Sequence, residues 1–91
     1  MASYRKLANV DTTEIQRLIE TALPGSVALV VDEANDGEHF SADVISPAFT
    51  GLSRVRQHQL VYEALGPKMG REIHALALRT WTPDRWAQRA P

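Results

Sequence analysis

The sequence predicts an α+β domain whose helices and strands follow the order αββαβα. Two segments repeat apolar residues at helical spacing, and a third opens with a helix-start signal. Three other segments either alternate apolar and polar residues or carry apolar residues on both faces. The second strand, second helix and third strand form a crossover unit, which joins parallel strands. We therefore expect a three-stranded mixed sheet with helices packed against it.

The N-terminal half is expected to hold one helix and a β-hairpin. Asp11 is placed to cap the helix, and its buried stripe consists of Ile15, Leu18, Ile19, Ala22 and Leu23. Strands are expected over residues 26–32 and 39–45, with a turn at residues 35–37. The second strand alternates, which predicts one water-facing side formed by His39, Ser41 and Asp43.

The C-terminal half is expected to hold a helix, a strand and a short final helix. The first of these begins at Leu52 or Ser53 and ends at Leu65, with one side lined by Val55, His58, Tyr62 and Leu65. Residues 73–80 are apolar on both faces, which predicts a central or well-covered strand. Thr82-Pro83-Asp84 is a helix start, and that helix should end near Gln88.

Length and composition limit the possible classes of protein. The 91 residues are enough for one domain, expected over residues 11–88, with an N-terminal tail at 1–10 that is a candidate for disorder and a C-terminal tail at 89–91. The chain has no cysteine, so it has no disulfide and no thiolate ligand or nucleophile of its own. No apolar run is long enough for a signal peptide or a membrane span, and we expect a cytoplasmic location.

Charge is unevenly distributed along the chain, although the net charge is only −1. Residues 1–51 carry three basic and eight acidic side chains, and residues 52–91 carry seven basic and three acidic ones. The basic half contains five candidates for contact with nucleic acid, namely Arg54, Arg56, Lys68, Arg71 and Arg79. A solvated basic surface is the simpler interpretation, since nonspecific affinity for DNA requires many neutralised phosphates. No nucleophile–base signature or phosphate-binding glycine loop is present, which argues against an enzyme.

Three stretches of the chain carry motifs that occur together, in this order, in one protein family. The first is His39-Phe40 followed by Val44-Ile45-Ser46-Pro47-Ala48-Phe49-Thr50-Gly51, and the second is Gln57-His58-Gln59-Leu60-Val61-Tyr62. The third is Ile73-His74-Ala75-Leu76-Ala77-Leu78, with Thr82-Pro83 and Trp86 behind it. In this combination the sequence resembles the BolA family, whose fold is similar to a class II KH domain.

The resemblance implies an adaptor that binds a monothiol glutaredoxin and shares a 2Fe–2S cluster with it, in iron–sulfur trafficking or iron regulation. His74 matches the family's histidine ligand. A second ligand in the family comes from the loop between the first two strands or from the histidine that matches His39. The loop of this chain, residues 32–38, has neither cysteine nor histidine, which leaves His39 as the nearby candidate. The partner would supply its cysteine and a glutathione thiolate, and we expect no stable cluster on the isolated chain.

Two further expectations concern His58 and the alternative function. His58 lies on the apolar side of the second predicted helix, where a hydrogen-bonded, half-buried structural histidine, or one that orients the strand carrying His74, is expected. The rival hypothesis is a DNA-binding transcriptional regulator that uses the basic second helix. Gln57 and Gln59 stand where relatives often carry arginine, which favours weak DNA binding at best. Alone, the chain is expected to be a monomer or a weak homodimer.

Overall fold

The computed structural model describes residues 11–89, and these residues form helices and strands in the predicted αββαβα order. The predicted tail at residues 1–10 lies outside the described residues, as do the last two residues of the chain. Two short 3₁₀ helices, η2 and η3, are additional to the predicted elements. The bounds are α1 Thr12–Ala22, β1 Val27–Asp32, β2 His39–Ile45, η2 Pro47–Phe49, α2 Arg54–Leu65, η3 Gly66–Lys68, β3 Ala75–Trp81 and α3 Pro83–Gln88.

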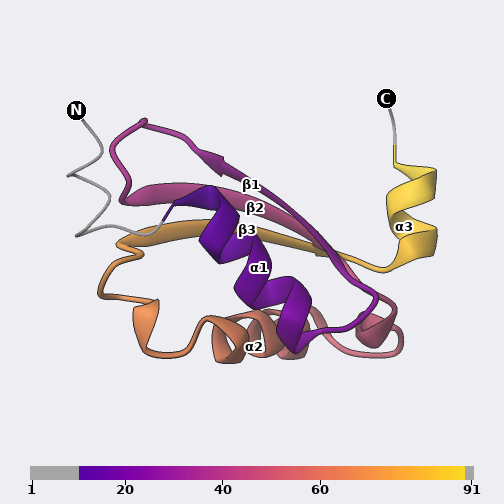
Figure 1. The fold of residues 1–91 in the computed structure, drawn as a ribbon. Helices are drawn as coiled ribbons and strands as arrows, with labels where there is room; N and C mark the ends of the chain where they lie inside the picture. Colours follow the sequence, from indigo (N-terminus) through magenta and orange to yellow (C-terminus); the bar gives the residue numbers. More distant parts are fainter. Residues whose placement is uncertain (1–10, 90–91) are drawn as a thin grey trace.

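The sheet has the order β1-β2-β3 and is mixed, as predicted. β1 and β2 pair antiparallel, and β2 and β3 pair parallel through the α2 crossover. Helices α1 and α2 lie on one face of the sheet, and α3 stands at the end where β3 finishes (Figure 1). The β1–β2 loop and the segment that leads into β3 lie together at the opposite end (Figure 1). The sheet therefore has two distinct ends, and each gathers its own set of polar side chains.

The core fills the space between the sheet and helices α1 and α2. The inward side chains of β2 are Phe40, Ala42 and Val44, each at most 2% exposed. They form one buried cluster with residues from both helices, β1 and the connections, namely Ile15, Ile19, Leu23, Ala28, Phe49, Val61, Leu65 and Ile73. The predicted stripe of α1 is confirmed in its centre, whereas Ala22 at its end is exposed.

Side-chain caps begin the helices where the sequence predicted. The Asp11 carboxylate accepts a hydrogen bond from the backbone N–H of Glu14 at 2.9 Å, and the Ser53 hydroxyl accepts one from Arg56 at 3.2 Å. Thr82 likewise accepts from Arg85 at 3.2 Å and begins α3. Each cap satisfies an N–H group that has no carbonyl partner within its helix. Among the described residues, no helix combines the length and the apolar character needed to cross a membrane.

The prediction that residues 73–80 form a central or well-covered strand is wrong in two respects. β3 begins at Ala75, because Ile73 and Gly70 hydrogen-bond within a tight loop, Ile73 N–H to Lys68 at 2.9 Å and Gly70 N–H to Ile73 at 2.8 Å. His74 thus precedes the strand instead of starting it. β3 is also an edge strand, and its outer face carries the exposed Ala75 and Ala77, with the half-buried Trp81 at its end.

The prediction of a water-facing side on β2 is also wrong for two of its three residues. β2 is the central strand, so its outer face is flanked by β1 and β3. Ser41 is 7% exposed and donates a hydrogen bond to Glu33, and the half-buried Asp43 accepts from Arg79 at 2.8 Å and 2.9 Å. Only His39, at the start of the strand, is exposed.

The predicted buried side of α2 is rotated from the observed one. Val55 is 67% exposed and Tyr62 is 39% exposed, whereas Val61 and Leu65 are buried at 0% and 2%. Apolar residues occur on more than one side of this helix, so its sequence does not specify a single stripe. The sheet and α1 select the side that they can cover.

This rotation predicts different costs for two substitutions that the sequence placed on the same stripe. Leu65→Ala should lower the free energy of unfolding by about 2–5 kcal/mol, because it leaves a cavity in the core. Val55→Ala should change it by no more than about 0.5 kcal/mol, as is usual at the surface. Urea denaturation of both variants measures the difference. Equal losses in the two variants would contradict the observed orientation of α2.

Candidate metal-ligand site

A short loop at residues 33–38 connects β1 and β2 and is held by the carboxylate of Asp32. This carboxylate accepts hydrogen bonds from the backbone N–H groups of Asp36 at 3.2 Å and Gly37 at 2.9 Å. Gly37 is buried and has a φ of +74°, a left-handed conformation that suits glycine. The loop is thereby closed so that Asp36 and His39 lie next to each other.

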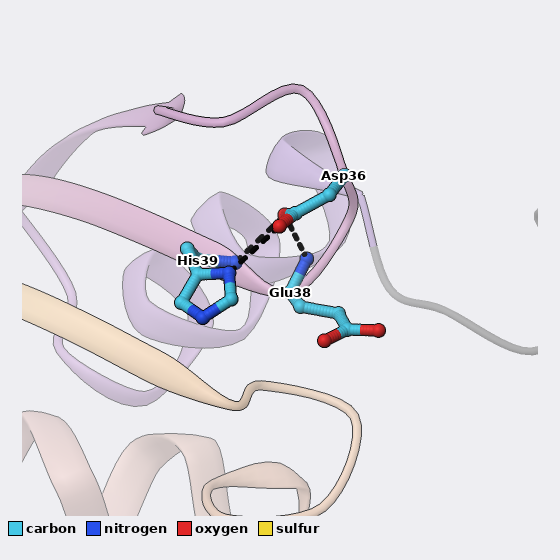
Figure 2. A group of neighbouring side chains, drawn as sticks. All are labelled: Asp36, Glu38 and His39. Atoms are coloured by element: carbon cyan, nitrogen blue, oxygen red, sulfur yellow. Dashed lines mark hydrogen bonds and ion pairs between the residues drawn. The ribbon is translucent and has the colours of Figure 1, made fainter.

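Asp36 holds the imidazole of His39 at the start of β2. One carboxylate oxygen of Asp36 accepts from the backbone N–H of Glu38 at 2.9 Å and of His39 at 3.1 Å. The other lies 2.7 Å from Nδ1 of His39, and Figure 2 shows both sets of contacts. A carboxylate at Nδ1 places the proton on that nitrogen of the neutral ring, which leaves Nε2 free to bind a metal.

His74 lies beside His39, as the predicted parallel pairing of the two strands requires. The backbone carbonyl of Glu38 accepts hydrogen bonds from the N–H groups of His74 at 3.0 Å and Ala75 at 3.1 Å. The two imidazole rings have centroids 5.9 Å apart and are inclined by 56°. Both histidines are exposed. The arrangement presents two imidazoles to solvent at one end of the sheet.

The charges around His39 shift two pKa values in opposite directions. Hydrogen bonds from the Glu38 backbone and from the His39 side chain lower the pKa of Asp36 to about 2. The hydrogen bond to Asp36 and the negative charge of that carboxylate raise the pKa of His39 above its ordinary value. Asp36 is therefore an anion at every physiological pH, and it keeps the His39 ring oriented.

The donor set of this end fits a borderline metal such as iron. Imidazole is a ligand of iron, and two histidines on one iron replace two cysteines in Rieske-type 2Fe–2S centres. His74 and His39 would be the ligands of that iron. The side chains of Asp36, Glu38 and His39 also place one ligand atom each within 4.8 Å of one another. No thiolate is available in the chain, so a cluster would need sulfur ligands from elsewhere.

His58 differs from its prediction in one respect. It is half-buried and lies edge-on to Tyr62, with ring centroids 6.4 Å apart, as expected of a residue with a structural role. However, its Nε2 atom is buried without a hydrogen-bond partner among the described residues. Burial, and then the charge of Arg54, lower the pKa of His58. His58 lines a cavity together with Arg54 and Arg79, away from the two exposed histidines.

The five predicted nucleic-acid contacts do not form one surface. Arg79 is bound to Asp43, and Arg56 lies 3.1 Å from the side-chain oxygen of Gln59. Lys68 and Arg71 line a depression beside η3, whereas Arg54 and Arg79 line a cavity next to β3. The basic residues are thus divided between separate places in the fold.

Two residues of the histidine site were missed from the sequence. Asp36 was assigned to a turn and not to the site. Glu38 contributes through its backbone carbonyl, which joins the two histidine-bearing segments, and such a role cannot be predicted from the type of side chain. The spacing Asp36-x-x-His39 was the available signal, because an acid three residues before a histidine can reach it across a tight turn.

Comparison with known proteins agrees with this fold and these motifs. The family described as "BolA-like protein" matches residues 20–85 of the chain. The Escherichia coli protein named "Acid stress protein IbaG" is 34% identical over 83 residues, which are 87% of this chain and 92% of that protein. This chain belongs to the BolA family.

Other similar proteins extend the comparison. The "DNA-binding transcriptional regulator BolA" of Vibrio cholerae is 42% identical over 50 residues, which are 55% of this chain and 47% of that protein, about half its length. The structure of a BolA homologue from Coxiella burnetii superposes with a TM-score of 0.75 at 42% identity and covers 87% of this chain and 99% of that one. The BolA domain of SufE1 from Arabidopsis thaliana has a TM-score of 0.69 at 31% identity, covering 79% and 91%.

The opposite pKa shifts of His39 and His58 can be measured directly. In an NMR titration, His39 should titrate above about 6.5 and His58 below it, because a carboxylate favours the charged ring and burial disfavours it. The raised pKa of His39 stabilises the fold below about pH 6.5, and this stabilisation is lost as pH rises through the folded value. The lowered pKa of His58 acts in the other direction, and its stabilisation is lost as pH falls.

Asp36→Asn should return the pKa of His39 towards its ordinary value and leave that of His58 unchanged. Asp84→Asn, in α3, is the matched control and should change neither. A His39 that titrates at or below His58 in the parent chain would refute the Asp36–His39 contact.

Proposed function

We propose that this chain is an adaptor that binds a monothiol glutaredoxin and shares a 2Fe–2S cluster with it as cargo. The observation that carries the proposal is the pair of exposed imidazoles of His39 and His74, with ring centroids 5.9 Å apart. Membership of the BolA family supports the same role, because the family resemblance implies this partner and this cluster. This role requires no catalytic step by the chain.

The division of ligands follows from the chemistry of the side chains. This chain offers nitrogen ligands and no sulfur, and 2Fe–2S clusters are usually held by thiolates. The partner's cysteine and a glutathione thiolate would hold one iron, and His74 with His39 would hold the other. Asp36 would fix the ring of His39 with Nε2 outward, as carboxylates do behind metal-bound histidines. Histidine in place of thiolate raises the potential of a cluster.

A DNA-binding regulator is the second candidate, and the name of the Vibrio cholerae relative favours it. The candidate would depend on the basic residues of the C-terminal half. Arg79 is already neutralised by Asp43, and the remaining residues lie in separate places. The adaptor is therefore the better-supported proposal.

The adaptor hypothesis predicts a cluster spectrum that depends on His74. When the chain is added to a cluster-loaded monothiol glutaredoxin, imidazole ligation should change the visible circular dichroism of the cluster. Folded His74→Ala should remove this change. His39→Ala should weaken or alter the mixed cluster by at least the roughly 10–100-fold that loss of an outer-shell partner costs, because it removes a proposed ligand. His58→Ala, at a residue that lines a cavity elsewhere, should leave the spectrum unchanged and mainly lower stability.

One further measurement completes this test. The isolated chain, reconstituted anaerobically, should retain no stoichiometric iron and sulfide, because it has no thiolate. A parent-like mixed spectrum in folded His74→Ala would show that His74 is not a ligand.

For the DNA-binding alternative, we predict weak and sequence-independent binding. Duplex DNA at physiological salt should bind with a dissociation constant no tighter than about 10⁻⁶ M, because the net charge is −1 and the basic side chains lie in separate places. Fluorescence anisotropy at several salt concentrations measures both affinity and salt dependence. A nanomolar, sequence-selective complex would instead favour the DNA-binding regulator over the adaptor.

A further inference from the structure

A cavity of about 440 Å³ lies at the end of the sheet opposite to the two histidines. Its walls come from the beginning of α2, the second half of β3 and the beginning of α3, which meet at the right of Figure 1. Its lining begins on β3 at Leu78, four residues beyond His74, which is roughly 13 Å at about 3.3 Å per strand residue. The cavity is therefore distinct from the proposed cluster site, and its volume is within the range of about 300–1,000 Å³ typical of small-molecule sites.

The lining of the cavity is basic and contains no acidic residue among the described part of the chain. Its three arginines are Arg54, Arg79 and Arg85. Arg79 forms a bidentate pair with Asp43, at 2.8 Å and 2.9 Å. Within residues 11–89, neither Arg54 nor Arg85 has a carboxylate within 4.0 Å. Two guanidinium groups from different helices thus border one cavity without a counter-ion from the described protein.

His58 lines the same cavity. Burial, and then the charge of Arg54, lower its pKa, so its neutral ring is favoured. The nearest polar lining groups, Gln57 and Thr80, are occupied with each other, since the Thr80 hydroxyl donates to the Gln57 amide oxygen at 2.6 Å. Gln57 donates in turn to the carbonyls of Phe49 and Leu52. The hydrogen-bonding capacity left in the lining is mainly that of Arg54, Arg85 and Nε2 of His58, which has no partner among the described residues.

The remaining walls are apolar. Leu52, Leu78 and Trp81 line the cavity beside the arginines. Trp81 is held by a hydrogen bond from its indole N–H to Asp43 at 2.9 Å and by an edge contact with Trp86 at 5.4 Å between ring centroids. A ligand matched to this lining has a compact apolar or aromatic body and an oxyanion group for the guanidinium groups.

A nucleic-acid backbone fits the surroundings less well. The other basic residues considered for DNA contact, Arg56, Lys68 and Arg71, do not line this cavity. A polyanion is bound along a track of several basic side chains, whereas Arg54 and Arg85 border a single, partly open cavity. A single oxyanion on a small molecule satisfies them.

We propose that this cavity binds a small organic oxyanion, a phosphate monoester or a carboxylate, with Arg54 and Arg85 on the oxyanion and with Leu52, Leu78 and Trp81 on the apolar body. The site is independent of the proposed cluster adaptor, and occupation of one does not require the other. Phosphate and carboxylate share the geometry that guanidinium groups recognise. Their difference in charge separates them by experiment.

The test uses phenyl phosphate, benzoate and phenol as probes of the full chain, followed by two-dimensional NMR. At least one of the two anions should give saturable shifts at Arg85, Thr80 and Trp81 and should raise the pKa of His58, because a nearby anion favours the imidazolium. Phenol, which has the same ring and no charge, should not. Tighter binding of phenyl phosphate identifies a phosphate monoester as the natural class, and tighter binding of benzoate identifies a carboxylate.

Variants locate the site. Arg54→Gln and Arg85→Gln should each weaken binding of the anion by about tenfold or more, the size expected for a charge-assisted hydrogen bond. Arg56→Gln, on the same helix as Arg54 but outside the cavity, is the matched control and should bind as the parent does. Thermal unfolding of each variant confirms that it is folded.

Three outcomes would overturn the proposal. They are saturation by phenol at the same concentration as by the anions, parent-like binding by both cavity variants, and absence of saturable shifts at the cavity with either anion. Tighter, strongly salt-dependent binding of a single-stranded oligonucleotide at the same residues would likewise replace it with a nucleic-acid site.

Discussion

The parallel pairing of β2 and β3 is the constraint on which the other features depend. It aligns His39 with Ala75 at one end and Ile45 with Trp81 at the other. The pairing needs a crossover that returns the chain to the starting end, and α2 with η3 provides it. The buried side chains Phe40 and Val44 of β2 pack against that crossover and fix its position. If the strands were antiparallel, His74 and His39 would lie at opposite ends of the sheet.

The Glu38 carbonyl completes this constraint at the histidine end. It accepts the N–H groups of both His74 and Ala75, so it pins the segment before β3 to the β1–β2 loop. The loop is itself closed by the carboxylates of Asp32 and Asp36. These contacts hold the two exposed imidazoles at a defined separation, with ring centroids 5.9 Å apart. Preorganisation of this kind reduces the entropy lost when a ligand is bound.

The outer face of the sheet is organised around a second polar group. Asp43, on the central strand, accepts from both Arg79 and Trp81. These donors lower the pKa of Asp43, with Arg79 the larger cause. The pair fixes Arg79 on the outer face and Trp81 next to α3, which leaves Arg54 and Arg85 as the free cations beside the cavity within the described residues. The electrostatics of one face of the sheet therefore determine which charges remain available at its edge.

The sequence by itself determined the order of elements, the helix starts and the pair of histidines. Caps such as Asp11 and Thr82 act over three residues, and turn signals such as Asn35-Asp36-Gly37 act over fewer, so their effects can be predicted from neighbours in the chain. The strand assignments and the crossover rule predicted that His39 and His74 lie at the beginnings of parallel neighbouring strands. That placement was confirmed, with His74 one residue before its strand.

The tertiary structure alone decided which strand is central, which side of α2 is buried and which charges are neutralised. Helical periodicity predicts that both Val55 and Leu65 are buried. Only the contacts of α2 with the sheet and α1 decide that Leu65 is buried and Val55 is exposed. Asp43 and Arg79 are 36 residues apart, and Arg54 and Arg85 come from different helices. Burial and ion pairing depend on contacts between distant segments, and these contacts cannot be predicted from local preferences along the chain.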